Sequence, residues 1–95
     1  MNSLILSERA RLSACVIICP GTHVLNLEDF EEVPGAQVPN VYDHCAKEIA
    51  LQRVASRRKI SEESAARWFQ IWIVQTEGSH GKILFRGKKR NEIAA

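Results

Sequence analysis

Two apolar runs separated by a polar, glycine-containing loop constrain the fold of this chain more than any other feature. The first run, RWFQIWIVQT (67–76), is mostly aromatic and β-branched from Trp68 to Val74, a composition that favours a pleated strand. The loop EGSHGK follows, and the second run, KILFRG (82–87), begins at the last residue of this loop. Apolar runs on both sides of such a loop predict a β-hairpin, preceded by a short helical turn in SEESAA (61–66).

A helical interpretation of residues 61–74 is the alternative. Ser61 would cap that helix, and with the helix before it the pair would resemble a helix-turn-helix. We favour the strand because a second apolar run follows so closely. Side chains alternate along a strand, so Phe69, Ile71 and Ile73 are predicted to face a covering helix. The opposite face is predicted to carry Trp68, Gln70, Trp72 and Val74.

The N-terminal half contains two further predicted strands and one helix. LSACVIIC (12–19) and THVLNL (22–27) are separated by Pro-Gly and predict a hairpin, whereas EDFEEVPGAQVPN (28–40) is a loop by composition. Asn40 is the expected N-cap of a helix that extends to Lys59. The predicted buried face of this helix consists of Val41, Tyr42, Cys45, Ala46 and Ile49.

These elements predict an α+β fold, with a small antiparallel sheet of β-β-α-β-β order packed on one main helix. The 95 residues suit one domain, which we expect at 12–87, with an N-terminal extension (1–11) and a basic C-terminal tail (88–95). No stretch approaches the roughly 20 apolar residues of a membrane span. The N-terminus lacks the pattern of a secretory signal, and three cysteines leave one unpaired, so we expect a cytoplasmic protein.

The segments GAQVPNVYDHCAKEIA (35–50) and ESAARWFQIWIVQTEGSHGKILFRG (63–87) resemble a family of short uncharacterised proteins common in rhizobia and other alphaproteobacteria. The matching positions are Gly35, Val38, Pro39, Asn40, Ala46, Ala50, Ile71, Ile73, Gly81, Ile83 and Phe85. About eleven extra N-terminal residues and the basic RGKKR end depart from the family pattern. The resemblance implies the β-β-α-β-β fold and no particular activity.

Residue types suited to metal binding or catalysis are present but poorly spaced. Cys15, Cys19 and His23, with His44 and Cys45 later, suggest zinc, yet Cys15 and Cys19 would stand about 13 Å apart on a strand. His44 and Cys45 are adjacent, and adjacent residues of a helix point in different directions. Motifs of serine hydrolases, zinc proteases and phosphate loops are absent. We therefore expect no catalytic residues, no metal, no cofactor and a protein that is not an enzyme.

Binding is the remaining class of function. We expect a protein-interaction or regulatory module that self-associates, or binds another protein, through the Trp68, Gln70, Trp72 and Val74 face. The alternative is nucleic-acid binding by the basic C-terminal half, which carries eleven Lys and Arg against five acids in residues 46–95. Its candidate residues are Arg53, Arg57, Arg58, Lys59, Arg86, Lys88, Lys89 and Arg90. The overall pI of about 8.6 is low for a dedicated nucleic-acid domain.

Overall fold

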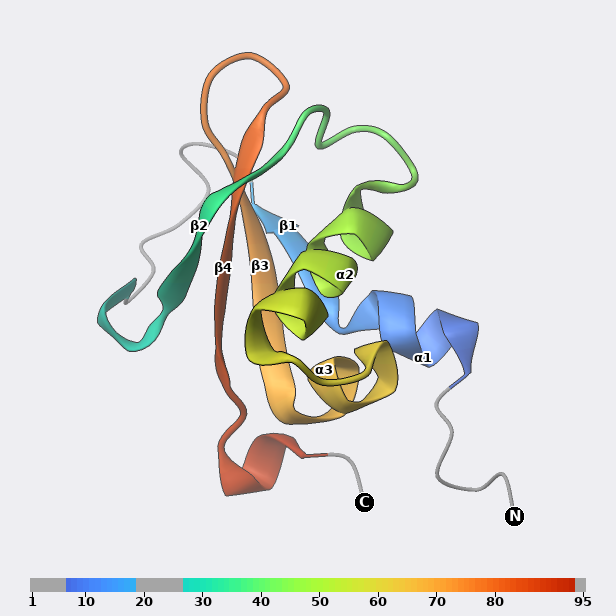
Figure 1. Ribbon diagram of the computed structural model, residues 1–95. Coiled ribbons are helices and arrows are strands. Elements are labelled where there is room, and N and C mark those ends of the chain that lie inside the picture. Colours follow the sequence, from blue (N-terminus) through green and yellow to red (C-terminus); the bar gives the residue numbers. More distant parts are fainter. Residues whose placement is uncertain (1–6, 19–26, 94–95) are drawn as a thin grey trace.

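The computed structural model describes residues 7–18 and 27–93, with the backbone alone for Leu27 and Ala36. It has an α+β fold, which confirms the predicted class (Figure 1). The described strands and the main helix follow in β-β-α-β-β order with two additional short α-helices, but the second strand is 31–38 and not the predicted 22–27. The elements are α1 (Glu8–Ser13), β1 (Cys15–Ile18), η1 (Leu27–Asp29), β2 (Glu31–Val38), α2 (Ala46–Arg58), α3 (Glu62–Trp68), β3 (Phe69–Gln75), β4 (Gly81–Gly87) and η2 (Arg90–Glu92). Within these described residues, no helix is long and apolar enough to cross a membrane.

The predicted C-terminal hairpin is confirmed as β3 and β4, which pair antiparallel from Phe69 opposite Gly87 to Gln75 opposite Gly81. Gly78 lies in the connecting turn with a φ of 58°, a backbone angle that glycine adopts without steric cost. The strand begins two residues later than predicted, because α3 continues through Trp68. Ser61 caps this helix by accepting a hydrogen bond from the Ser64 N–H at 3.1 Å.

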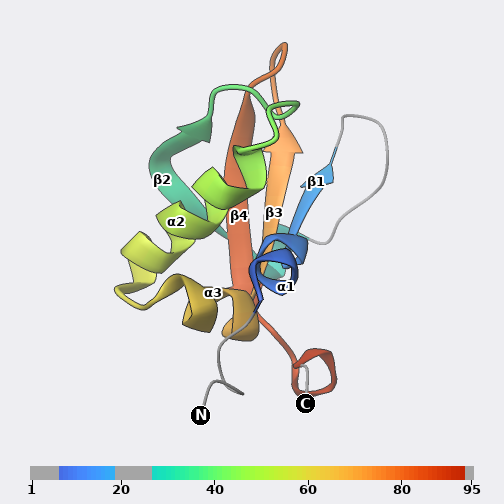
Figure 2. The same cartoon turned by 90° about the vertical axis from the view of Figure 1, so that its right-hand side faces the viewer.

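The sheet order is β1-β3-β4-β2, with β1 parallel to β3 and the other pairs antiparallel. The sheet is therefore mixed rather than antiparallel. Strands β1 and β2 occupy opposite edges of the described sheet (Figures 1 and 2). Because β2 is not the predicted partner strand 22–27, the predicted N-terminal hairpin stays a prediction. In the predicted strand 12–19, the first two residues belong to α1, and β1 begins at Cys15. Most of the predicted strand 22–27 lies outside the described residues.

Strand β2 lies within the segment that composition indicated to be a loop. Its pairing with β4 is irregular between Glu32 and Gln37, where Pro34 and Gly35 lie, and Gly35 has a φ of 70°. A bulge in an edge strand tolerates both residues, because proline has no N–H to donate and glycine adopts positive φ. The proline and glycine therefore mark a bulge and not the absence of a strand.

Helix α2 ends as predicted, with Lys59 as a left-handed C-cap, but it begins at Ala46 rather than after Asn40. Asn40 instead accepts a hydrogen bond from the Tyr42 N–H at 2.9 Å, which stabilises a turn. Tyr42 is 68% exposed, so its predicted place in the core is wrong. Val41 and Ala46 are buried as predicted.

The α-helices gather on one side of the sheet (Figures 1 and 2). The predicted alternation of β3 is confirmed on that side, where Ile71 and Ile73 are fully buried and Phe69 packs against the core. Other core residues include Leu51 and Val54 of α2 and Ile83 and Phe85 of β4. The opposite face of β3 carries Gln70, Trp72 and Val74, by the alternation of side chains along a strand.

Candidate functional site

The predicted basic residues of α2 and of the C-terminal segment lie toward the same end of the sheet, with α3 between them (Figure 2). The Arg58 guanidinium lies over the Phe69 ring, 5.5 Å from its centre, and Phe69 pairs with Gly87 at the end of β4. Lys88 follows, and its N–H donates to the Trp68 carbonyl at 2.8 Å. We call this region the basic end, which consists of Arg53, Arg57, Arg58, Lys59, Lys88, Lys89, Arg90 and the neighbouring Trp68.

Most cations of the basic end are exposed and available to a ligand. Arg53, Lys59, Lys89 and Arg90 are exposed, and none of them forms an ion pair within the described part of the chain. Arg57 lies 3.6 Å from a Glu31 carboxylate oxygen, but both side chains are about half exposed, so solvent screens this pair. Positive potential therefore persists over the C-terminal turn of α2 and the segment after β4.

Lys88 has a structural role within this surface. Its Nζ donates to the Ala66 carbonyl at 2.9 Å, near the C-terminal end of α3. Carbonyl groups at a helix end carry partial negative charge, so a lysine there is stabilising. Lys88 therefore ties the segment after β4 to α3 and holds Lys89 and Arg90 close to Trp68.

A shallow pocket of about 360 Å³ lies between α2 and the bulge of β2, beside the basic end. Arg53, Ser56 and Arg57 line it from α2, and Pro34 and Gly35 line it from β2. Two guanidinium groups and a hydroxyl are hydrogen-bond donors with a net positive charge, which suits a phosphate group. The pocket is therefore a candidate anion subsite within an otherwise open charged surface.

Arg86 was predicted as a nucleic-acid contact, but its side chain forms an ion pair with Glu92. Its guanidinium donates to both carboxylate oxygens of Glu92, at 2.8 and 2.7 Å, and lies 5.5 Å from the centre of the Phe30 ring. The hydrogen bond from Arg86, with one from the Lys89 N–H, lowers the pKa of Glu92 to about 2. Arg86 therefore holds the C-terminal segment against the sheet.

The two tryptophans do not form the single open face that the sequence predicted. Trp68 is the last residue of α3 and is 49% exposed at the basic end. Trp72 lies on the sheet with its ring centre 4.5 Å from that of Phe30, and its Nε1 is buried, as is the Oε1 of Gln70. Val74 is half-buried on the same strand. Phe30 thus covers part of the predicted face.

The predicted cysteine and histidine candidates separate in the structure. Cys15 is buried with its thiol 3.4 Å from the Lys47 carbonyl, and burial raises the pKa of this thiol to about 11, so it is unreactive. Cys19 and His23 lie outside the described residues. His44 and Cys45 lie in the turn before α2 and not within a helix, so the geometric argument against their cooperation does not apply.

Comparison with protein-family models, with curated proteins and with solved structures finds no match. The resemblance to short rhizobial proteins stays a prediction. The function of this chain is therefore inferred from its own surface chemistry.

Proposed function

We propose that this protein is a non-enzymatic module that binds single-stranded nucleic acid at its basic end. The observation that carries the proposal is the position of exposed, unpaired cations of α2 and of the segment after β4 toward the same end of the sheet as the exposed Trp68. Proteins that bind single strands combine backbone-tracking cations with aromatic rings on which bases stack. The modest overall charge of +2 conceals this local concentration of positive charge.

Each part of the surface has a distinct role in the proposed complex. The pocket with Arg53, Ser56 and Arg57 receives one phosphate, Lys89 and Arg90 contact the backbone farther along, and a base stacks on Trp68. Stacking of one base on an aromatic side chain is worth about 1–3 kcal/mol and tolerates any base. The proposed binding is accordingly insensitive to sequence and sensitive to salt.

The salt dependence follows from the number of unpaired cations. Contact of Arg53, Lys59, Lys89 and Arg90 with one phosphate each gives a slope of log K against log salt of about −3, at roughly −0.7 per contact for single strands. Raising the salt from about 50 to about 200 mM then weakens binding by roughly 50-fold. Binding by stacking alone would show a much smaller slope.

The direct test is fluorescence anisotropy of a labelled single-stranded 12-nucleotide DNA. The double variant Lys89→Gln with Arg90→Gln is expected to weaken binding by roughly 10-fold or more and to reduce the salt slope by about 1.4. The matched control, Lys47→Gln with Lys82→Gln, removes two charges near the other end of α2 and β4 and should change little. Equal losses in both variants, or no binding at low salt, would overturn the proposal.

Self-association is the second candidate, favoured by an exposed apolar side chain on β1. Val16 is 43% exposed and is the register partner of Trp72, so both lie on the sheet face away from the helices. An exposed apolar side chain on this face can be covered by a second copy of the chain. A dimer of this kind should dissociate in the Val16→Ser variant, as measured by sedimentation equilibrium. A wild-type protein that is monomeric at high concentration rejects the candidate.

We place the protein in the cytoplasm, where nucleic acid is accessible and thiols stay reduced. Cys15 and Cys45 are free thiols, and a reducing compartment keeps such groups reduced.

A further inference from the structure

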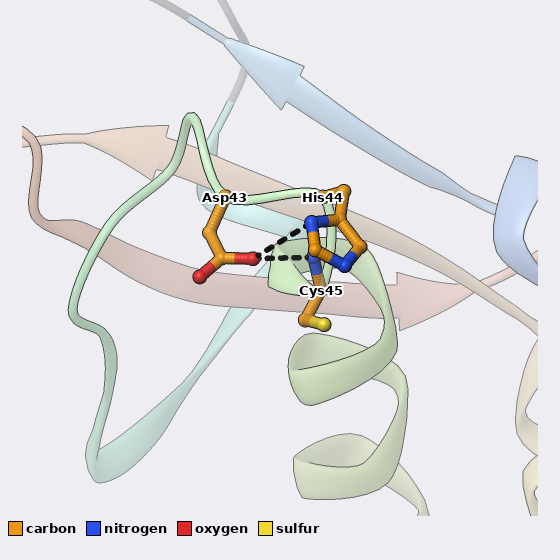
Figure 3. A group of neighbouring side chains, drawn as sticks. All are labelled: Asp43, His44 and Cys45. Carbon is orange, nitrogen blue, oxygen red and sulfur yellow. Dashed lines mark hydrogen bonds and ion pairs between the residues drawn. The ribbon is translucent and has the colours of Figure 1, made fainter.

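Three consecutive residues with metal-binding side chains lie together in the turn that leads into α2. Asp43, His44 and Cys45 offer a carboxylate oxygen, an imidazole nitrogen and a thiol sulfur, all within 4.8 Å of one another. Figure 3 shows the Asp43 carboxylate turned toward the His44 ring, whose Nδ1 lies 3.5 Å from Asp43 Oδ1. We call these three residues the Asp43–Cys45 cluster.

The backbone that carries the cluster is held in place on both sides. The Tyr42 N–H donates to Asn40 Oδ1 at 2.9 Å, the Asp43 N–H to the Asn40 carbonyl at 3.1 Å and the Ala46 N–H to the Asp43 carbonyl at 3.0 Å. Val41 before the cluster and Ala46 after it are buried in the core. The turn is therefore ordered without a ligand, which lowers the entropy that binding would cost.

The side chains retain the freedom to close around an ion. His44 has a 94% exposed side chain, and Asp43 is about half exposed. Ligand atoms of a tetrahedral zinc site lie roughly 3.3–3.8 Å apart, given metal–ligand bonds of about 2.0–2.3 Å. The three ligand atoms lie within 4.8 Å of one another, so the side chains must close by about 1 Å to reach that spacing.

We propose that Asp43, His44 and Cys45 bind a divalent transition-metal ion, zinc above all, with a fourth position open to water or to a further ligand. One nitrogen, one sulfur and one oxygen form a ligand set that zinc accepts, whereas the thiolate disfavours calcium and magnesium. The carboxylate and the thiolate neutralise the two charges of the ion, which offsets the unfavourable positive end of the α2 dipole.

Proton release is part of the proposed binding. A cysteine thiol is ordinarily protonated at neutral pH, and the ion replaces its proton when the sulfur–metal bond forms. The affinity should accordingly rise with pH.

The proposed metal site is separate from the basic end. It lies before the first residue of α2, whereas Arg57 and Arg58 lie in the last turn, about 20 Å away at about 1.5 Å per residue. An experiment can therefore refute the proposed metal site without refuting nucleic-acid binding at the basic end, and the reverse also holds.

Cobalt(II) titration of the reduced, tag-free protein tests the inference, because cobalt replaces zinc and is coloured. We expect a thiolate-to-cobalt charge-transfer band in the near ultraviolet at one equivalent, bleached by zinc. Cys45→Ser should remove this band. His44→Gln and Asp43→Asn should weaken the apparent affinity by roughly 10-fold or more. Asp43→Asn keeps an oxygen to accept the Cys45 N–H, which donates to Asp43 Oδ1 at 2.8 Å in the native turn, so the fold is preserved.

The matched control is Cys15→Ala, which removes the buried thiol and should leave the band unchanged once circular dichroism shows the variant folded. Zinc titration calorimetry in two buffers of different ionisation enthalpy should report proton release that Cys45→Ser diminishes. A band that survives Cys45→Ser, or no band at a tenfold excess of cobalt, would overturn the inference.

Discussion

Gly81, the first residue of β4, lies where a side chain has no space. A Cβ at this position would be 2.5 Å from Val41 Cγ1 and 2.8 Å from Ile73 Cγ2, and both neighbours are buried. Contacts this short require displacement of about 1 Å, and overpacking of a core typically costs about 1–3 kcal/mol. The Gly81→Ala variant tests this packing directly.

The expected net destabilisation is about 1–2 kcal/mol. Replacing glycine by alanine stabilises by about 0.4–1 kcal/mol through the unfolded chain, which offsets part of the overpacking. With a urea slope of about 1.2 kcal/mol per molar, the unfolding midpoint should fall by roughly 1 M. Val41 immediately follows the turn at Asn40 and its N–H donates to the Ser79 carbonyl at 2.7 Å, so the perturbation also reaches the turn before α2.

Gly87, at the other end of β4, is the matched control. No atom lies within 4 Å of a Cβ built there, so Gly87→Ala should be neutral or slightly stabilising. Adding Val41→Ala to Gly81→Ala removes the closest contact. The double variant should therefore be destabilised by about 1 kcal/mol less than the sum of the destabilisations of the two single variants. Equal stabilities of the two alanine variants, or additivity of Gly81→Ala with Val41→Ala, would refute the packing argument.

Three further predictions concern the cap of α3 and the face of the sheet away from the helices. Ser61→Ala removes the N-cap acceptor and should cost about 1 kcal/mol, seen as a melting temperature lower by roughly 5 °C. The carboxylate of Glu92, whose pKa is lowered to about 2, stabilises the fold at neutral pH, and this stabilisation is lost as pH falls from about 4.5 toward 2. Urea unfolding of Glu92→Gln, which lacks the charge that pairs with Arg86, should therefore differ from wild type at pH 6 and converge with it near pH 2. Phe30→Ala should accelerate hydrogen exchange at the indole Nε1–H of Trp72, measured by NMR, whereas an unchanged rate would mean that Phe30 does not shield it.

The sequence predicted correctly those elements that depend on residues close together in the chain. The alternation of Ile71 and Ile73, the glycine-containing loop after β3 and the arginines at the end of α2 each depend on a few neighbouring residues, and the structure confirms them. The pairing of strands depends on distant contacts instead. Nothing in residues 12–18 specifies that β1 pairs with β3 in parallel, so the sequence predicted an antiparallel sheet where the structure has a mixed one.

The misplaced start of α2 had the largest consequence for function. Asn40 is a good helix cap by type, but its side chain stabilises a turn, and the helix begins six residues later at Ala46. The helical assumption made His44 and Cys45 diverge, so the Asp43–Cys45 cluster was missed. The contiguous DHC tripeptide, followed by an alanine-rich helix, was the available sequence signal.

The basic end was predicted in composition but not in detail. Clusters of Arg and Lys at two separate places in the chain indicated it, and the contact of Arg58 with Phe69 places the end of α2 near the start of β3, which pairs with the end of β4. The pairing of Arg86 with Glu92 and the exposure of Trp68 depend on tertiary contacts that no local pattern contains. Seven of the eight proposed cations therefore lie in the basic end, and Arg86 does not.

The most direct test of the central claim, that the basic end binds single-stranded nucleic acid, is an amide NMR titration with a short single-stranded oligonucleotide at low salt. We predict shifts at Arg53, Ser56 and Lys59, at Lys89 and Arg90, and at the indole of Trp68, all reversed by added salt. Shifts confined to the N-terminal end of α2, or an unchanged spectrum with excess oligonucleotide, would contradict the account.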